Sequence, residues 1–326
     1  MADGSQDMVL RPAEMLAKPV RLDPAFSNPE KVLDLCRMSA PYSLAAKVHK
    51  RAQTGKDVPW FRVMWAYGGK VVEPRSEFIF RSENFIEGAK KSFDAKVIVP
   101  QALMNNINTP MAAGPPHLDL PKFRGGDRMP FDLLVAMAYS GLFHDWAVPQ
   151  ASTISWFYRG RGGDFDYWPN GPDGERQSVE APVWNVGYVS DNEYMWHRVG
   201  AIGPTANHME PGTISRDAQL HAHSHDKGWA IVDGENRWEF TEAETRISIL
   251  WKAFAFENER EYQRYLNKEH DLTIPEVVEV LNRDLDARGL GRLPEDCDFS
   301  DEETRKFVLR AYRPSPVNDD YRPVIE

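Results

Sequence analysis

Cysteine is scarce in this sequence, because Cys36 and Cys297 are the only two among 326 residues and lie far apart. Two distant cysteines provide neither a disulfide framework nor a cysteine-based zinc site. The chain also lacks an Asn-x-Ser/Thr sequon, an apolar stretch of the ~20 residues that span a bilayer, and the basic-then-apolar start of a signal peptide. These absences predict a cytoplasmic protein in a reducing compartment.

Basic residues are outnumbered, with 39 Lys and Arg against 49 Asp and Glu and a formal net charge of −10. Such a chain lacks the basic surface that grips phosphate backbones. Nucleotide-binding motifs are missing too, since Gly160-Arg161-Gly162-Gly163 matches no dinucleotide fingerprint, and no Gly-x-Ser-x-Gly elbow supports a hydrolase. We therefore expect a small-molecule partner, no nucleic acid and no membrane, with the oligomeric state left open.

Aromatic residues are abundant: 10 Trp, 11 Tyr and 16 Phe accompany 24 Pro and 22 Gly. Aromatics suit half-buried pleated surfaces and Gly and Pro mark turns, so this mixture favours a β-rich body. Strand patterns run from about residue 60 to 256, short helices precede them, and a helical tail follows over 257–326. The patterns predict one α+β domain over residues 1–326, built on a β-barrel or sandwich.

Several local patterns predict where elements begin and end. Ser27-Asn28-Pro29-Glu30 is a helix start, and a second helix is expected over Tyr42–Arg51. The apolar run 131–143 predicts a buried helix. Ser300-Asp301-Glu302-Glu303 predicts a capping box at the last helix. The Gly- and Pro-rich stretch 159–175 indicates a hairpin or surface loop.

His117-Leu118-Asp119 is the first candidate for chemistry. On an extended segment, residues two apart point to the same face, so an imidazole and a carboxylate would project together. Pro115, Pro116 and Pro121 flank the motif and favour that extended backbone. One more imidazole would complete the facial triad of two histidines and one carboxylate that holds non-haem Fe(II). A bare His-x-Asp match, taken alone, is more often a coincidence.

The second histidine is His197, 78 positions after Asp119, where it follows an apolar strand pattern and an Asp191-Asn192 turn. His-x-Asp, a distant His and then an Arg on the last core strand resembles the order found in the Fe(II)/2-oxoglutarate dioxygenase superfamily. The resemblance covers roughly residues 95–256. It implies a double-stranded β-helix (jelly roll) core flanked by N- and C-terminal helices, with His117, Asp119 and His197 as metal ligands and catalytic centre. The alternative for His197 is a satisfied core histidine beside Trp196.

The resemblance also implies a reaction and its cofactors. Three protein ligands leave three positions on an octahedral Fe(II), which 2-oxoglutarate and O₂ fill in this family. We therefore expect an oxidoreductase that oxidises a small organic substrate, by hydroxylation or a related oxidation, with release of succinate and CO₂. The substrate and the type of oxidation are not evident from the sequence.

The far carboxylate of 2-oxoglutarate needs a cation, preferably the planar fork of arginine. Arg246-Ile247-Ser248 begins a clear strand pattern, with Arg246 and Ser248 on one face, and looks like the Arg-x-Ser pair of part of the family. Arg216 competes, because it lies nearer to His197 in the sequence. We prefer Arg246 as the anchor, since Arg216 stands in Gly- and Pro-rich sequence.

A rival metal site is suggested by the alternating imidazoles of His221, His223 and His225. On a strand these three would share a face and could bind zinc or serve a cupin-like metalloenzyme without 2-oxoglutarate. The polar flanks and the Asp226-Lys227-Gly228 turn favour a solvated loop instead. A third possibility is a jelly-roll binding protein without catalysis.

A set of aromatic residues near the candidate site could line an apolar substrate pocket: Trp156, Tyr158, Tyr167, Trp168 and Trp196. Core packing is the expected role for most of them.

Overall fold

The structure is a computed structural model that describes residues 17–48, 57–294 and 296–312. Over these residues the larger of its sheets has eleven strands, and all its pairings are antiparallel. From one edge to the other its strands are β1 (Val20–Leu22), β11 (Val183–Ser190), β8 (Gln150–Tyr158), β16 (Arg246–Phe256), β5 (Val97–Asn108), β3 (Trp60–Tyr67), β2 (Tyr42–Leu44), β13 (Gln219–Ala222), β14 (Trp229–Asp233) and β15 (Asn236–Phe240), with β4 (Lys70–Val71) paired to β3.

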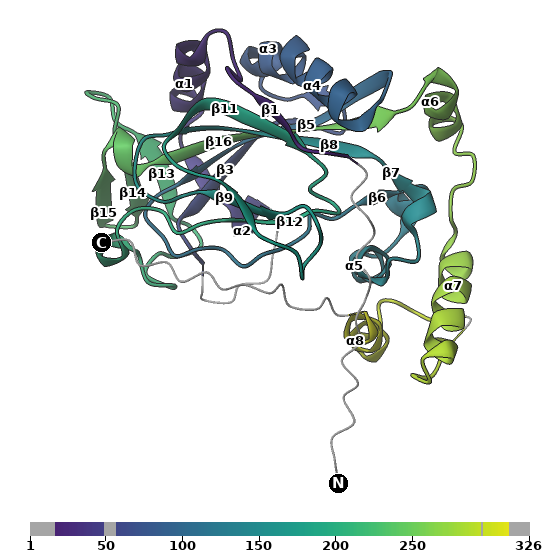
Figure 1. The fold of residues 1–326 in the computed structure, drawn as a ribbon. Coiled ribbons are helices and arrows are strands. Elements are labelled where there is room, and N and C mark those ends of the chain that lie inside the picture. The colour runs from purple at the N-terminus through teal and green to yellow at the C-terminus, as the bar shows by residue number, and fades with distance from the viewer. Residues whose placement is uncertain (1–16, 49–56, 295, 313–326) are drawn as a thin grey trace.

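A smaller sheet faces the middle of the larger one (Figure 1). It contains β10 (Gln177–Val179), β9 (Phe165–Trp168) and β12 (Trp196–Val199), in that order. The extended segment 111–119 lies beside β12 and adds a fourth strand, because Met111 pairs with Ile202 and His117 pairs with His197. A further pair, β6 (Lys122–Phe123) and β7 (Ala147–Val148), stands apart from both sheets.

The chain alternates between the two sheets. It passes from β5 in the larger sheet to segment 111–119 in the smaller one, returns to β8, and crosses to β9 and β10. It then returns to β11, crosses to β12 and finally reaches β16 in the larger sheet. The neighbours in space are β5-β16-β8-β11 in one sheet and 111–119-β12-β9-β10 in the other. Eight strands connected in this way in two facing sheets form a jelly roll. The predicted α+β fold class with a jelly-roll core is confirmed.

Side chains of β16 divide between two environments, because successive residues of a strand point to opposite faces. Ile247, Ile249 and Trp251 join the apolar cluster on the outer face of the larger sheet. Helices cover that face in Figure 1: α1 (Pro29–Met38), α3 (Glu77–Phe80) and α4 (Glu83–Phe93). Arg246, Ser248 and Lys252 have the opposite parity and point between the two sheets, where Trp156 of β8 and Phe165 of β9 also pack.

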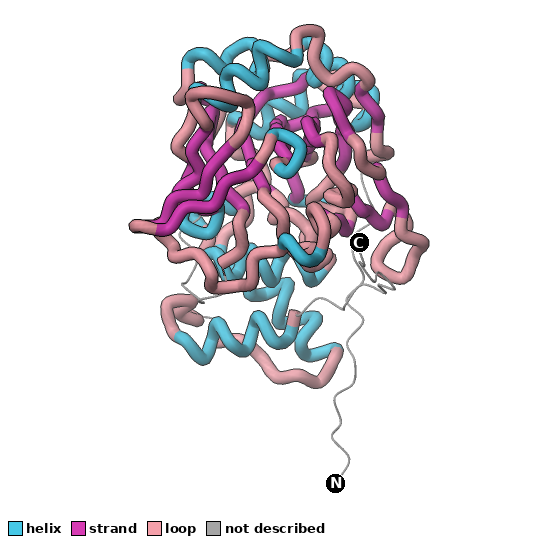
Figure 2. The backbone as a smooth tube through the Cα atoms, turned by 90° about the vertical axis from the view of Figure 1, so that its left-hand side faces the viewer, coloured by secondary structure: helices cyan, strands magenta, loops and turns pink. Residues whose placement is uncertain are grey.

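A second apolar cluster lies beside the jelly roll. It joins α5 (Phe131–Ser140) to α7 (Ile274–Ala287) and α8 (Glu302–Ala311), and these helices lie below the sheets in Figure 2. Helix α6 (Glu259–Leu266) leads to them from the end of β16. The predicted buried helix and the helical tail are therefore both present. The cap of α8 differs by one residue, because Asp301 rather than Ser300 accepts the amide hydrogen bond of Thr304, at 2.8 Å.

Two other local predictions have different outcomes. The stretch 159–175 forms the first part of a hairpin, one of the two alternatives predicted, because it contains β9, which pairs antiparallel with β10 and whose four residues are all buried at the centre of the smaller sheet. Its glycines and prolines lie on either side of that strand and hide it from pattern analysis. Tyr42–Leu44 is a strand, and only Ala45–Val48 (α2) is helical within the predicted helix over Tyr42–Arg51, whose last residues lie outside the described ranges.

Candidate metal centre

The smaller sheet brings His117 and His197 side by side. The amide of each histidine donates a hydrogen bond to the carbonyl of the other, at 3.0 Å in both directions, and the ring centroids lie 4.4 Å apart. Two residues on, the amide of Asp119 donates to the carbonyl of Asn192, at 2.9 Å. These backbone bonds fix the register in which His117, His197 and Asp119 share one face.

Both imidazoles present the same nitrogen to that face. Nδ1 of His117 lies 3.1 Å from the carbonyl oxygen of Pro115, and Nδ1 of His197 lies 2.9 Å from that of Met195. A carbonyl oxygen only accepts hydrogen bonds, so each Nδ1 carries the proton and each Nε2 keeps its lone pair. A backbone carbonyl on the second nitrogen is the usual way in which proteins orient metal-binding histidines.

Asp119 completes the cluster, and Lys252 holds it from the opposite sheet. Oδ1 of Asp119 lies 4.0 Å from Nε2 of His197, and Oδ2 lies 2.7 Å from Nζ of Lys252. Lys252 also contacts Glu193, whose side chain is only 2% exposed. One buried cation thus bridges two carboxylates beside the imidazoles. Lys252 and Glu193 form the acid-base surroundings of the cluster that sequence analysis missed.

The electrostatics favour the forms that bind a metal. Burial, reinforced by the nearby His117, lowers the pKa of His197 to about 4, so its imidazole is neutral at physiological pH. Burial alone would raise the pKa of Asp119, but the charge of Lys252 and then those of the two imidazoles hold it well below its usual range. The pKa of Glu193 is raised by burial, which Lys252 only partly offsets. Asp119 is therefore the more acidic carboxylate of the pair.

The three side chains predicted from the sequence are therefore brought together. Each offers one ligand atom, and these atoms all lie within 4.8 Å of one another. The donor set fits a divalent transition metal such as Fe(II), because two imidazoles and one carboxylate leave further coordination positions open. His197 is buried, whereas His117 and Asp119 are half-buried, so the cluster remains accessible from one side.

Arg246 lies at the start of β16, on the same face as Lys252. Its guanidinium is 1% exposed, and Nε donates a hydrogen bond to the carbonyl of Gly163 at 2.7 Å. The Nη2 atom is buried and has no hydrogen-bond partner among the described residues. Burial lowers the pKa of Arg246 to about 10, with partial compensation from Tyr158 and Asp164, so the group stays charged at neutral pH. Ser248 is buried two residues further along.

Arg216 has a different environment. It lies just before β13, at the β2–β13 end of the larger sheet, and its Nη2 donates to the carbonyl of Ala46 in α2 at 3.1 Å. Its side chain is half-buried, whereas that of Arg246 is enclosed between the two sheets. The two arginines proposed from the sequence are therefore held by different parts of the fold.

Aromatic rings connect the metal cluster with Arg246. Phe165 lies 5.7 Å from the ring of His197 and 5.4 Å from that of Trp156, and the guanidinium of Arg246 lies 5.9 Å from the Trp156 ring. Trp156, Tyr158 and Tyr167 belong to the apolar cluster between the sheets. Trp168 lies instead under the guanidinium of Arg198, on the other side of the smaller sheet, as the alternation of β9 requires.

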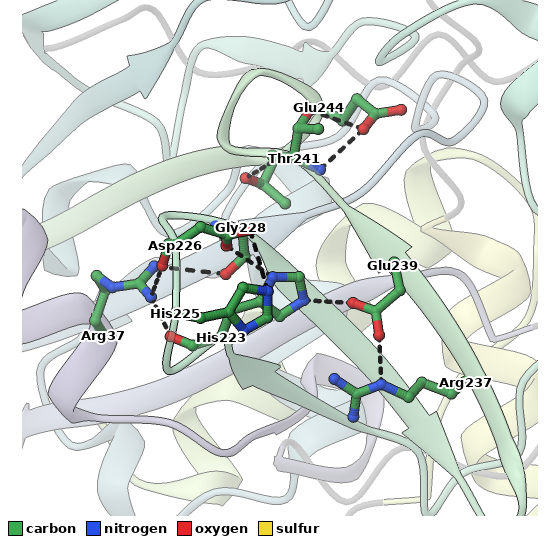
Figure 3. A network of polar contacts seen from close by, with 10 residues as sticks. Arg37, His223, His225, Asp226, Gly228, Arg237, Glu239, Thr241 and Glu244 are labelled. Carbon is green, nitrogen blue, oxygen red and sulfur yellow. Dashed lines mark hydrogen bonds and ion pairs between the residues drawn. The ribbon is translucent and has the colours of Figure 1, made fainter.

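The three alternating histidines do not share a strand face. β13 ends at Ala222, so His221 lies on the strand while His223 and His225 lie in the loop that follows. The rival metal site of His221, His223 and His225 on one strand is therefore not formed, and His223 and His225 lie in a loop, as the polar flanks favoured. A second group of possible ligands among the described residues contains His223, His225 and Asp226, and Figure 3 shows it close by.

The fold and the cluster define a jelly-roll protein with two histidines and one carboxylate converging between its sheets. No protein-family model and no curated protein matches the sequence. No helix among the described residues is long and apolar enough to cross a membrane.

Several solved structures are similar to the chain in fold. An oxidoreductase of the 2OG-Fe(II) oxygenase family from Burkholderia pseudomallei is 15% identical, with a TM-score of 0.40 over 72% of this chain and 84% of that one. A prolyl-4-hydroxylase from Pseudomonas putida is 11% identical, with a TM-score of 0.38 over 73% and 93%. HygX from Streptomyces hygroscopicus, solved with nickel, 2-oxoglutarate and hygromycin B, is 9% identical, with a TM-score of 0.39 over 74% and 84%.

Proposed function

We propose that the protein is an Fe(II)- and 2-oxoglutarate-dependent oxygenase that oxidises a small organic substrate. The observation that carries the proposal is the convergence of Nε2 of His117, Nε2 of His197 and a carboxylate oxygen of Asp119 between the sheets of a jelly roll. Both imidazoles have their other nitrogen occupied by a carbonyl, so Nε2 is the atom left for a metal. When bound, Fe(II) supplies the activation of O₂ and the oxidative decarboxylation of 2-oxoglutarate to succinate and CO₂.

Arg246 supports the 2-oxoglutarate part of the proposal. A buried guanidinium with an unpartnered Nη2 atom is costly unless an anion accepts its hydrogen bond. Within the proposed function, that anion is the far carboxylate of 2-oxoglutarate, with the Ser248 hydroxyl as a second donor. The rings of Trp156 and Phe165 would then border the cosubstrate between Arg246 and the metal cluster.

Lys252 has a positioning role in this arrangement. By occupying Oδ2 of Asp119, it leaves Oδ1, the oxygen nearer to His197, for the metal. A carboxylate that binds through one oxygen keeps more positions on the metal open for cosubstrate and O₂. Lys252 also neutralises part of the negative charge that Asp119 and Glu193 place between the sheets.

The direct test is turnover in the absence of a known substrate. Metal-free protein loaded with Fe(II) and supplied with 2-oxoglutarate and O₂ should slowly form succinate, measured by mass spectrometry. Asp119→Ala should form none above the rate of free Fe(II). In the absence of O₂, the visible absorption of an Fe(II) chelate with 2-oxoglutarate should appear in the native protein and disappear in that variant.

Two alternative functions of the protein predict different results in this test. A metalloenzyme of another kind would bind Fe(II) at the cluster without consuming 2-oxoglutarate or forming the chelate band. A jelly-roll binding protein without catalysis would show neither metal-dependent absorption nor succinate. Either result would overturn the proposed function.

A further inference from the structure

A second cluster of possible metal ligands lies outside the jelly-roll centre, in the loop between β13 and β14. Asp226 is its middle member: Oδ1 lies 2.8 Å from Nδ1 of His223, and Oδ2 lies 3.3 Å from Nε2 of His225. The two imidazole rings are nearly parallel, with centroids 5.0 Å apart and planes at 12° (Figure 3). Two ring nitrogens and one carboxylate therefore converge at one point of the loop.

The loop is held in this shape by the guanidinium of Arg37, which comes from α1. Its Nη2 atom donates to the carbonyls of His223 and Asp226, and its Nη1 atom donates to that of Gly228 at 3.5 Å. The amide of His223 also bonds to the carbonyl of Gly228 at 3.0 Å, and the amide of Gly228 bonds to Oδ1 of Asp226 at 2.6 Å. These contacts hold the loop 223–228 in one defined shape.

Gly228 shows how closely the loop is folded around the cluster. A Cβ atom at this position would lie 2.6 Å from Nδ1 of His223 and 2.9 Å from Oδ1 of Asp226. A side chain at Gly228 would therefore collide with these two ligand atoms.

Glu239 of β15 orients His223 from the other side. One of its oxygens contacts Nε2 of His223 and the other contacts Arg237. Nδ1 of His223 is hydrogen-bonded to Oδ1 of Asp226 at 2.8 Å, and a zinc ion would replace the proton between them. The carboxylate of Glu239 beside the same imidazole is the kind of outer partner that surrounds metal ions in proteins.

We propose that this loop binds a zinc ion through Nδ1 of His223, Nε2 of His225 and the carboxylate of Asp226, with Glu239 as the partner that fixes His223. Zinc–ligand bonds of ~2.0–2.1 Å place the corners of a tetrahedron about 3.3 Å apart. The separations of 2.8 and 3.3 Å are close to that value, so small side-chain movements accommodate the ion. The His225 side chain is 73% exposed, which leaves an entry path and a position for water as fourth ligand.

The zinc site has a structural effect that follows from its position. The ligands stand in the β13–β14 loop, Glu239 stands on β15, and Arg37 links the same loop to α1. A bound ion would therefore fasten the β13–β15 sheet edge and stabilise the folded chain by mass action. The proposal does not depend on the oxygenase function.

The experiment compares zinc binding in variants that lack the jelly-roll centre. His117→Ala removes one ligand of that centre, and titration with Zn²⁺ against a chromophoric chelator should still show tight binding of one ion per chain. Adding His225→Ala should remove one full equivalent. Adding His221→Ala is the matched control and should change nothing, since His221 lies outside the cluster. Co²⁺ should give the intense visible absorption of a tetrahedral ion in the control and lose it with His225→Ala.

Glu239→Gln provides a test that leaves all three ligands in place. Loss of an outer carboxylate partner weakens metal binding by ~10–100-fold, so the zinc dissociation constant should rise within that range. Equal zinc stoichiometry in the His117→Ala protein with and without His225→Ala would overturn the proposal. Failure of the oxygenase to form succinate would leave these titrations unchanged, so the two proposals fail separately.

Discussion

Nζ of Lys252 lies 2.7 Å from Oδ2 of Asp119, while the other oxygen of that carboxylate faces Nε2 of His197. The contact crosses from the larger sheet to the smaller one, because Lys252 belongs to β16 and Asp119 is the last residue of segment 111–119 beside β12. The two halves of the jelly roll are thereby joined by a half-buried ion pair at the metal cluster. Removal of either partner leaves a partly enclosed charge without compensation.

We expect Lys252→Met to destabilise the protein strongly. It leaves the buried Glu193 and the half-buried Asp119 without a cation. Breaking a fully buried pair costs about 3–5 kcal/mol in the free energy of unfolding, and the exposure of Asp119 should bring the loss to the lower end of that range. Urea denaturation followed by circular dichroism measures the change. Adding Glu193→Gln to Lys252→Met should recover part of the loss, because one of the two carboxylates is then neutral. A double variant as unstable as Lys252→Met alone would contradict this account of the pair.

His197→Ala should abolish binding of Fe(II) or Co(II) at the jelly-roll centre while leaving the fold largely intact. The change removes one of three ligands and no large apolar side chain, so chelation is lost and core packing is mostly kept. Metal content after anaerobic loading gives the stoichiometry, and far-ultraviolet circular dichroism serves as the control for folding. His117→Ala should behave in the same way. Full metal occupancy at this centre in both variants would show that these histidines are not ligands.

Arg246→Leu should weaken 2-oxoglutarate binding far more than Arg216→Leu. The buried guanidinium of Arg246 would lose a charge-assisted pair with the cosubstrate, worth about 2–5 kcal/mol, whereas Arg216 is already bonded to the carbonyl of Ala46. Anaerobic titration of the Fe(II)-loaded proteins measures both dissociation constants. Arg246→Lys keeps the charge and should show an intermediate loss. If Arg216→Leu has the larger effect, the anchor lies outside β16.

Stability of the metal-free protein should fall between pH 6.5 and pH 4 because of His197. Its pKa is about 4 in the folded chain against 6.5 in a free side chain. Within that window the unfolded chain binds a proton that the folded chain does not, so the free energy of unfolding decreases as the pH falls. The full difference is on the order of 3 kcal/mol. Urea midpoints at a series of pH values should show this slope in the native protein and a shallower one in His197→Gln; equal slopes would contradict it.

Much of the fold was predictable because it depends on local patterns. The parity of Arg246, Ser248 and Lys252 within an apolar run identifies β16 and the face that points inward. His117 and Asp119 share a face on any extended segment, and the prolines around them favour such a segment. The strand β9 was hidden, because four residues between glycine-rich turns give too short a pattern, and only its central place in the smaller sheet makes it a strand.

The residues of the site that sequence analysis did not identify are connected by contacts between distant parts of the chain. Lys252 stands 133 positions from Asp119 and 59 from Glu193, and no local pattern connects them. A lysine on the inward face of a buried strand was the available signal, since a charge there requires a partner. Likewise, Arg37 and Glu239 reach His223 from α1 and β15, and only the folded chain brings them to the loop.

The reciprocal hydrogen bonds between His117 and His197 also determine where the chain tolerates changes in length. One residue inserted or deleted within 112–116 or 193–196 would shift that pairing by one position and turn an imidazole away from its partner. The connection 169–176 lies outside the paired segments, whereas 203–216 is tied to Arg161 and Pro110 by backbone hydrogen bonds and contributes Ile214 to the core. Loop grafts at 169–176 should therefore preserve the centre, which makes this connection the place where the scaffold accepts changes in length.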